Sequence, residues 1–258
     1  MKILHVALVA LVFSSCVSSN YYQIYKATAE GATLNQDVII FEDENCKVFY
    51  DLWDNGGDIG FRIFNKTKDD LIIDLNKTFF VINGITYDYY LDRTFSNSSS
   101  TGVTESGSVY FNLLFPSYRS INTVSKGRTK TNVSSNSTSF NEKTRRTILP
   151  GTSISISEYN VTYGKYLNCD LPQRPSRRNI KTLNFGKSNS PFVFSNVITY
   201  SVGGLISRIE NKFFVSEVTA RPELGLFKVV TKSECGTTLM RSKRVFKESP
   251  PDKFYFKY

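Results

Sequence analysis

The chain has 258 residues, of which 40% are hydrophobic and 14% aromatic, including 20 Phe and 15 Tyr. This composition can fill a hydrophobic core and excludes intrinsic disorder over most of the length. The formal charge is +9 and the pI is near 9.3. Such a balance favours anionic neighbours, namely lipid head groups, acidic glycans or nucleic acid, although a plain solvated basic surface has the same composition.

The N-terminal segment has the pattern of a secretion signal. Lys2 supplies a positive charge, and residues 3–13 are apolar apart from His5. As a helix this run would span roughly 16 Å, about half of the ~30 Å hydrocarbon core of a bilayer. It is therefore too short to cross a membrane and has the length of a signal peptide. We expect residues 1–15 to be removed.

The residues Phe13-Ser14-Ser15-Cys16 resemble the serine-rich lipobox of Bacteroides-type lipoproteins, although Phe13 stands where Leu is usual. The resemblance implies that Cys16 becomes the first residue and carries fatty acids such as palmitate, with residues 16–20 as a lipidated tether. Several acyl chains hold a protein firmly on a bilayer. The alternative is an ordinary signal peptide in which Cys16 is incidental.

The residues after Cys16 bear on which membrane side the protein faces. Residues 17–20 lack the acidic cluster that accompanies surface display in similar lipoproteins. We therefore expect a cell-envelope protein anchored in the outer membrane, and its composition here favours the periplasmic side over the cell surface.

Cysteine and histidine usage excludes several kinds of chemistry. Cys46, Cys169 and Cys235 remain after Cys16, so either one disulfide of unknown pairing or three thiols is expected. No spacing fits a zinc site, and we assign no metal and no cofactor. His5 is the only histidine and lies in the segment to be removed. The mature chain then has no Ser-His-Asp or Cys-His catalysis and no histidine-ligated zinc.

Alternating apolar residues predict strands over the first part of the mature chain, residues 21–93. The predicted strands cover residues 21–28, 38–41, 46–53, 59–65, 71–75, 78–82 and 85–90. The break at residues 54–58 (Asp-Asn-Gly-Gly-Asp) predicts a hairpin, and Asn83-Gly84 predicts a type I′ turn.

Strand and turn motifs in this part resemble an uncharacterised group of Bacteroides-type envelope lipoproteins. The motifs are Asn65-Lys66-Thr67, Ile73-Asp74-Leu75, Thr78-Phe79-Phe80, Asn83-Gly84 and Tyr87-Asp88-Tyr89-Tyr90, with residues 198–201 and 214–219 farther on. The resemblance covers much of residues 21–93 and 190–222. It implies a β-sandwich of immunoglobulin-like appearance and brings no known activity with it.

Residues 94–147 have a different composition, with 28 Ser, Thr or Asn residues among 54. Seven basic and two acidic residues give this insert a charge of +5, so it carries most of the basicity. Such a composition cannot bury enough apolar surface to offset the entropy of ordering. We expect a largely flexible polar insert, with residues 109–115 as a possible strand or short helix.

The sequence of residues 148–258 predicts the second part of the sandwich and a C-terminal tail. Strands are expected at residues 153–157, 159–166, 192–202, 212–219, 226–231 and 254–258, and a Pro- and Arg-rich loop at residues 170–178. About a dozen short strands without long helical patterns predict an all-β sandwich.

Several clusters of charged or aromatic residues are candidate functional sites. The basic ones are Lys126/Arg128/Lys130, Lys143/Arg145/Arg146, Arg174/Arg177/Arg178/Lys181 and Arg241/Lys243/Arg244/Lys247. The acidic residues are Glu42, Asp43, Glu44, Asp51, Asp54 and Asp58. Paired carboxylates can hydrolyse glycosides when they face each other, whereas turn carboxylates are usually only solvated. Trp53 and residues 87–90 would form a sugar-stacking platform, or pack in the core.

The sequence therefore predicts a lipid-anchored envelope protein that is not an enzyme. Its sandwich is expected to bind another envelope protein or a glycan, and its partners also include the bilayer and anionic lipid, whereas nucleic acid is not expected. One alternative is a glycan hydrolase that uses carboxylates alone. Another is a structural spacer or assembly subunit of an envelope complex.

Overall fold

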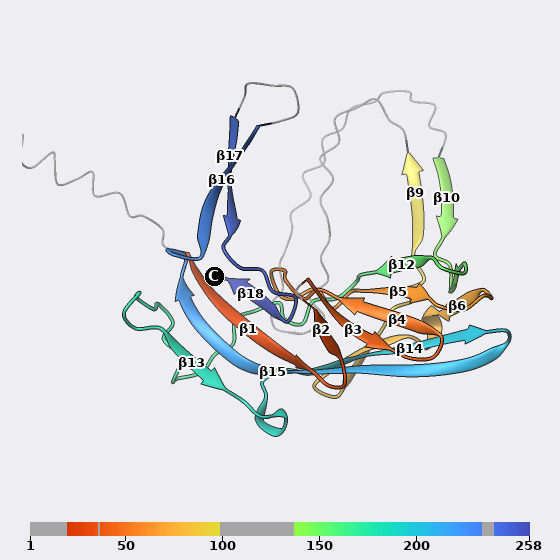
Figure 1. The fold of residues 1–258 in the computed structure, drawn as a ribbon, viewed down its shortest axis with the longest axis horizontal. Coiled ribbons are helices and arrows are strands. Elements are labelled where there is room, and N and C mark those ends of the chain that lie inside the picture. Colours follow the sequence, from red (N-terminus) through yellow and green to blue (C-terminus); the bar gives the residue numbers. More distant parts are fainter. Residues whose placement is uncertain (1–19, 36, 99–136, 234–239) are drawn as a thin grey trace, which may run out of the picture. The chain divides into compact units, whose positions relative to one another are not determined.

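The computed structural model describes residues 20–35, 37–98, 137–233 and 240–258 (Figure 1). The chain divides into two compact units, residues 1–90 with 144–258 and residues 91–143. The expected signal peptide, Cys16, residues 109–115 and Cys235 lie outside the described residues. Within the described residues, no helix has the length and apolar character needed to cross a bilayer.

Over its described residues, the larger unit consists of strands joined by turns and two short 3₁₀ segments. Its strands are β1 (Tyr21–Ala29), β2 (Thr33–Asn35), β3 (Val38–Glu42), β4 (Cys46–Tyr50), β5 (Phe61–Asn65), β6 (Leu71–Asp74), β7 (Phe79–Ile82), β8 (Ile85–Asp88), β11 (Arg145–Ile148), β12 (Ser153–Ile156), β13 (Lys181–Asn184), β14 (Val193–Val202), β15 (Leu205–Pro222), β16 (Phe227–Ser233), β17 (Met240–Phe246) and β18 (Lys253–Lys257). The 3₁₀ segments are η2 (Leu75–Lys77) and η3 (Lys187–Asn189).

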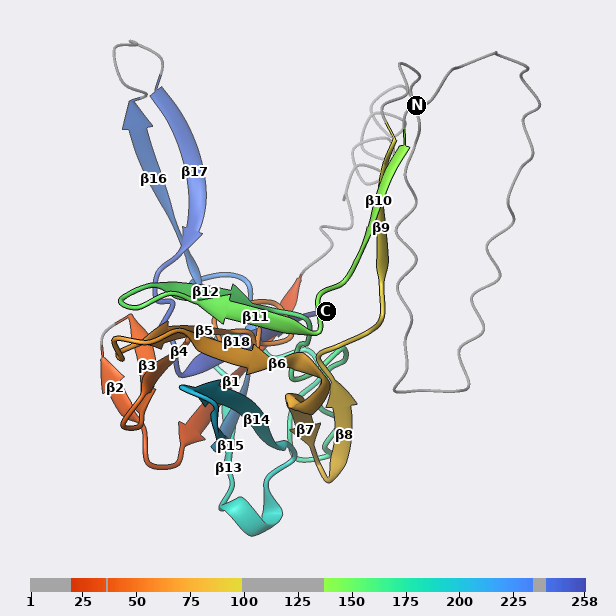
Figure 2. The same cartoon turned by 90° about the vertical axis from the view of Figure 1, so that its right-hand side faces the viewer.

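Two antiparallel sheets pack face to face, which confirms the predicted all-β sandwich (Figures 1 and 2). One sheet has nine strands, with the order β11-β6-β14-β15-β1-β18 and with β7, β8 and β13 attached beside this path. The other has the order β12-β5-β4-β3-β2. The Phe213 ring of β15 contacts Phe41 and Tyr50 of the facing sheet, with centroids 5.3 and 5.1 Å apart.

The period of two residues in the strands decides which side chains enter this core. In β4, Cys46, Val48 and Tyr50 are buried, whereas Lys47 and Phe49 between them are half-buried. In β15 the buried side chains change parity, because Ser216 is an extra residue in the pairing with β1. A β-bulge of this kind allows both halves of one long strand to direct side chains into the core.

A buried polar network joins the two sheets at their centre. Asn196 of β14 accepts a hydrogen bond from the Tyr89 hydroxyl (2.8 Å) and donates one to the Ile59 carbonyl (2.8 Å). Asn211, its cross-strand partner in β15, donates to the Tyr50 hydroxyl (2.8 Å). All of these side chains are buried, so their polar atoms depend on one another for partners.

The predicted hairpin around residues 54–58 is confirmed in its pairing, because β4 and β5 are antiparallel neighbours, but its connection is longer than expected. Strand β4 ends at Tyr50 and β5 begins at Phe61, so residues 51–60 form a long connection and not a tight turn. This loop crosses to strand β18, where Asn55 pairs with Tyr255 as an isolated parallel bridge. By contrast, the turn at Asn83-Gly84 is confirmed as type I′, since φ is positive at both residues (48° and 82°).

Two further predictions need correction. Residues 159–166 are not a strand and contribute a single bridge, between Asn160 and Asp58. The sandwich resumes at β11, inside the segment assigned to the flexible insert, because residues 145–148 pair with β6 and form the edge of the nine-stranded sheet.

The smaller unit also contains ordered strands where the sequence predicted flexibility. Strands β9 (Thr94–Ser98) and β10 (Ser137–Asn141) pair over their whole length. At their base, the buried carboxylate of Glu142 accepts hydrogen bonds from the Arg93 guanidinium (2.6 Å) and the Leu91 amide (3.0 Å). A charged pair of this kind fixes the two chain segments side by side.

Candidate functional site

An aromatic cluster joins the β16–β17 hairpin to the sandwich. The hairpin pairs only with itself among the described strands and projects from the body (Figure 1). At its base Phe227 and Phe246 lie opposite each other, with ring centroids 4.3 Å apart. Tyr22 of β1 contacts both rings, and Trp53 of the long loop contacts Phe246 at 5.0 Å. Since a lone hairpin has little stability of its own, this cluster holds it in place.

A pocket of about 270 Å³ opens beside this cluster, and we call it the Trp53 pocket. It is lined by Ile24, Trp53, Arg221, Gly225, Leu226, Phe246, Lys247, Glu248, Pro250 and Lys253. The lining comes from β1, the 51–60 loop, the end of β15, the β15–β16 turn, the end of β17, the segment that follows it and the first residue of β18. Residues far apart in the sequence therefore build one wall with the only tryptophan of the chain.

The Trp53 pocket combines an aromatic wall with an excess of positive charge. Arg221, Lys247 and Lys253 line it, against the single carboxylate of Glu248. None of the three cations forms an ion pair within the described part of the chain, so their charge is available to a ligand. Aromatic faces accept the apolar face of a sugar ring, and cations pair with carboxylate, sulfate or phosphate groups.

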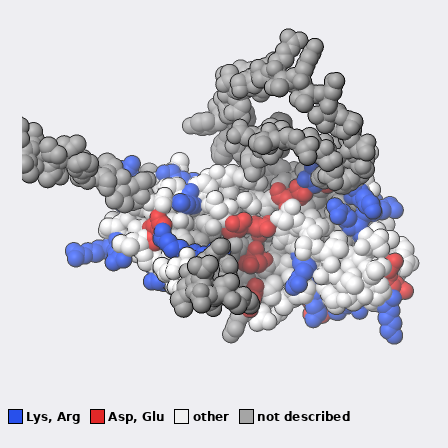
Figure 3. Space-filling view, turned by 90° about the horizontal axis from the view of Figure 1, so that it is seen from above, with Lys and Arg blue, Asp and Glu red and all other residues white. Residues whose placement is uncertain are grey.

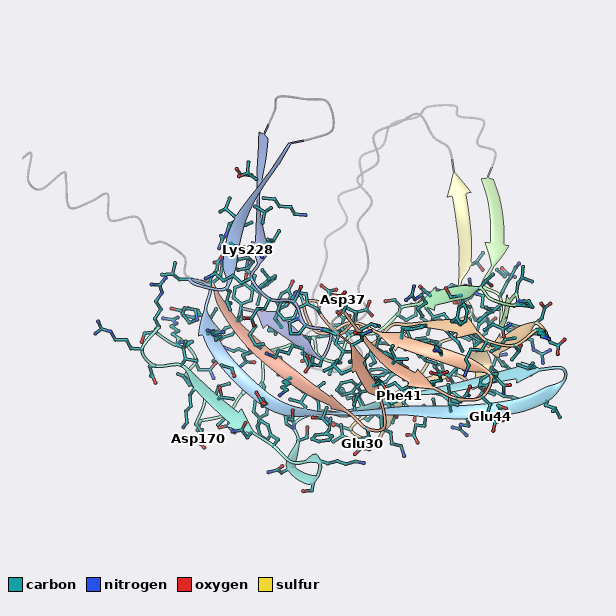
Figure 4. All side chains as sticks on the ribbon, viewed as in Figure 1. Glu30, Asp37, Phe41, Glu44, Asp170 and Lys228 are labelled. Atoms are coloured by element: carbon teal, nitrogen blue, oxygen red, sulfur yellow. The ribbon has the colours of Figure 1, made fainter. Side chains whose placement is uncertain are left out.

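A second hollow lies on the outer side of the five-stranded sheet, and we call it the acidic groove. It measures about 460 Å³, and Asp37, Asp51, Asp58 and Arg62 are among its lining residues. Figure 3 shows acidic side chains gathered in the middle of the face seen from above, and Figure 4 labels Asp37 there. The Asp58 carboxylate accepts hydrogen bonds from the Gly60 amide (2.7 Å) and the Ser157 hydroxyl (2.9 Å).

Burial raises the pKa of the Asp51 carboxyl above its usual value, and the nearby charges of Asp58, Asp37 and Asp54 raise it further. An acid with a raised pKa in the folded state destabilises the fold when it ionises. The loss begins as the pH rises through the ordinary pKa of Asp and is complete above the raised one.

We therefore expect Asp51→Asn to stabilise the protein at neutral pH, with a gain that vanishes in acid. The Trp53 amide keeps its acceptor, because an asparagine oxygen can replace the carboxylate oxygen that it contacts at 3.0 Å. Since Asp51 keeps solvent access, the gain in Tm should be small, on the order of a degree. Thermal melts over a pH series measure it, and Asp70→Asn, at an exposed site outside the groove, is the matched control. A gain that is the same at all pH values would contradict the electrostatic cause.

The structure separates the two halves of the predicted sugar platform. Trp53 lies at the Trp53 pocket, whereas Tyr89 is buried in the core, where its ring packs against Phe61 with centroids 5.5 Å apart. Tyr87 packs on Phe80 in the same region. The core interpretation therefore holds for Tyr87, Tyr89 and Tyr90, which lie in the core or pack against it, and of the predicted platform Trp53 stays available as a stacking surface.

The predicted acidic cluster is divided as well. Glu42 forms ion pairs with Lys66 (2.6 Å) and Lys47 (3.3 Å), and Asp43 accepts a hydrogen bond from the Tyr200 hydroxyl (2.5 Å). These carboxylates hold the β3–β4 turn and are not part of the groove. The groove instead gains Asp37, a residue that sequence reasoning missed because it belongs to a different turn.

The structure also shows where two of the cysteines and two of the basic clusters lie. Cys46 and Cys169 are free thiols, and burial raises the pKa of Cys46, which makes it unreactive. The cluster at residues 126–130 lies outside the described residues, and residues 174–178 form the predicted loop. Lys243, Arg244 and Lys247 lie on or next to β17, where the sequence did not predict a strand.

Comparison with known proteins adds no relative to this picture. No family model matches the chain, and neither the curated proteins nor the solved structures contain a match to it.

Proposed function

We propose that this protein is a lipid-anchored envelope protein, held by Cys16, whose sandwich acts as a non-catalytic binding module for an acidic glycan. The observation that carries the proposal is the Trp53 pocket, in which three cations without ion-pair partners among the described residues flank an aromatic wall. A sugar ring stacked on Trp53 would bring its acidic substituents to Arg221 and Lys253. The orientation towards the periplasm remains part of this proposal.

The test uses the fluorescence of Trp53, the only tryptophan, as its readout. We expect oligouronates to shift its emission in a saturable way, and neutral gluco-oligosaccharides of the same length to leave it unchanged. Arg221→Gln and Lys253→Gln should each weaken binding about tenfold, the cost of one charge-assisted hydrogen bond. Arg208→Gln and Arg146→Gln, at exposed sites away from the pocket, are the controls. Equal binding of neutral and acidic sugars, or normal affinity in the two pocket variants, contradicts the proposal.

Carboxylate-dependent glycan hydrolysis is the second candidate. The acidic groove favours it, because two of its carboxylates have different surroundings: the pKa of Asp51 is raised, and Asp58 is held by hydrogen bonds. A carboxyl with a raised pKa can act as the acid of such a reaction, and a second carboxylate in the same groove would act as the base or nucleophile. Incubation of the protein with the same oligosaccharides decides between the two functions. Cleavage products that disappear in both Asp51→Asn and Asp58→Asn would replace the binding module with a hydrolase.

A further inference from the structure

The described chain begins beside the root of the β16–β17 hairpin. Asn20 donates a side-chain hydrogen bond to the Glu223 carboxylate (2.7 Å), and its carbonyl accepts one from the Glu223 amide (3.0 Å). Glu223 starts the turn that joins β15 to β16. Two hydrogen bonds therefore fix the point at which the N-terminal tether leaves the sandwich.

The length of this tether limits where a lipid anchor can lie. Cys16 is four residues before Asn20, and a fully extended chain gains at most about 3.6 Å per residue, or about 14 Å in all. Strand β15 has 18 residues and a contour of roughly 60 Å. A lipid on Cys16 therefore holds the bilayer near the Pro222 end of β15, not near its other end at the Gly203-Gly204 turn.

The surface at that end carries the features of a membrane-facing patch, and we call it the hairpin surface. Its cations are Lys228, Lys243, Arg244 and Lys257, and all four are exposed. The strand register places Lys228 and Lys243 on one face of the hairpin and Arg244, beside Val229, on the other, so the surface includes both faces. Glu223 is its carboxylate and is already paired with Arg244 at 2.8 Å. Leu224 and Val229 add two aliphatic side chains that are each 66% exposed. Figure 4 labels Lys228 on the hairpin that projects from the body.

We propose that the hairpin surface docks on the anionic head groups of the bilayer that holds the Cys16 lipid. The inference rests on the lipid anchor of the proposed function and concerns residues other than those that line the Trp53 pocket. Cations attract anionic lipid only within about a Debye length, roughly 8 Å at physiological salt. The short tether supplies that proximity, and exposed aliphatic side chains next to cations suit the boundary between head groups and acyl chains.

The experiment uses the acylated protein in vesicles of phosphatidylcholine, alone or mixed with phosphatidylglycerol. A nitroxide on the phosphatidylcholine head group quenches Trp53, which lies at the hairpin base with its ring centroid 5.0 Å from that of Phe246. We expect clearly stronger quenching in the vesicles with phosphatidylglycerol. High salt should reverse that increase while the protein still sediments with the vesicles, because salt screens the docking and leaves the lipid in place.

Charge-reversal variants complete the test. Lys228→Glu combined with Lys243→Glu should reduce the extra quenching at least twofold, since neither ammonium has an ion-pair partner among the residues described. Arg208→Glu combined with Arg146→Glu changes the net charge equally at distant sites and should have no effect. Docking is overturned if the anchored protein shows the same weak quenching in both kinds of vesicle, or if the hairpin variant behaves as the wild type. Release of the protein by salt, with no acyl mass on Cys16, instead overturns the anchor and the docking with it.

Discussion

Asn196→Ala is expected to destabilise the protein by about 3 kcal/mol, which corresponds to a fall in Tm of roughly 10 °C. The amide of Asn196 is buried and bonds to the Tyr89 hydroxyl and to the Ile59 carbonyl. The substitution leaves both of these groups without their partner in a space that alanine does not fill. Leaving a buried polar group unpaired lowers the stability by more than its hydrogen bond contributed. The loss of stability therefore exceeds that of an ordinary surface substitution.

Thermal and urea unfolding measure this loss. Asn76→Ala removes the same amide at an exposed position and should change the stability by less than about 0.5 kcal/mol. Tyr89→Phe removes only the hydroxyl group that donates a hydrogen bond to Asn196. If the network is real, the double variant should cost less than the sum of the two single ones, because both remove the same hydrogen bond. Strict additivity would show that the two side chains do not depend on each other.

Local sequence features predicted much of the fold. Alternating apolar residues located strands such as β1 and β4, because one face of each must enter the core. Asn83-Gly84 predicted its turn since both residues tolerate positive φ. Strand β17 was missed because its sequence, Met-Arg-Ser-Lys-Arg-Val-Phe, shows no apolar alternation. Its partner β16 and the aromatic cluster define it, and these are tertiary features.

The candidate sites were less predictable for the same reason. Trp53 could be named from the sequence as a stacking residue, but its neighbours Arg221 and Lys253 come from strands about 170 and 200 residues away. Likewise Asp51 and Asp58 lie close together in the sequence, and only the pairing of β3 with β4 adds Asp37 to them. Residue types indicate possible chemistry, whereas the sheet register decides which of them meet.

The loop of residues 51–60 carries residues of both candidate sites, so its geometry should be sensitive to substitution. Its backbone is bound on two sides: the Gly56 amide donates to the Tyr255 carbonyl of β18 (2.7 Å), and the Thr162 amide donates to the Gly56 carbonyl (2.9 Å). Gly57 lies against the Phe254 ring. The two glycines therefore allow the loop to approach these segments more closely than a residue with a Cβ could.

Gly56→Ala is expected to destabilise the protein by about 3 kcal/mol or more, through a clash added to an unfavourable φ. A Cβ at this position would lie 2.4 Å from the Thr162 carbonyl oxygen, and φ is +92°. Gly203→Ala is the matched control, since its φ is also positive (+57°) but its surroundings are open, so only about 1 kcal/mol should be lost. Calorimetry gives the two losses, and the emission of Trp53 reports whether the loop has moved. Equal losses in both variants would show that backbone conformation alone, and not close packing, requires glycine in the loop that connects the Trp53 pocket with the acidic groove.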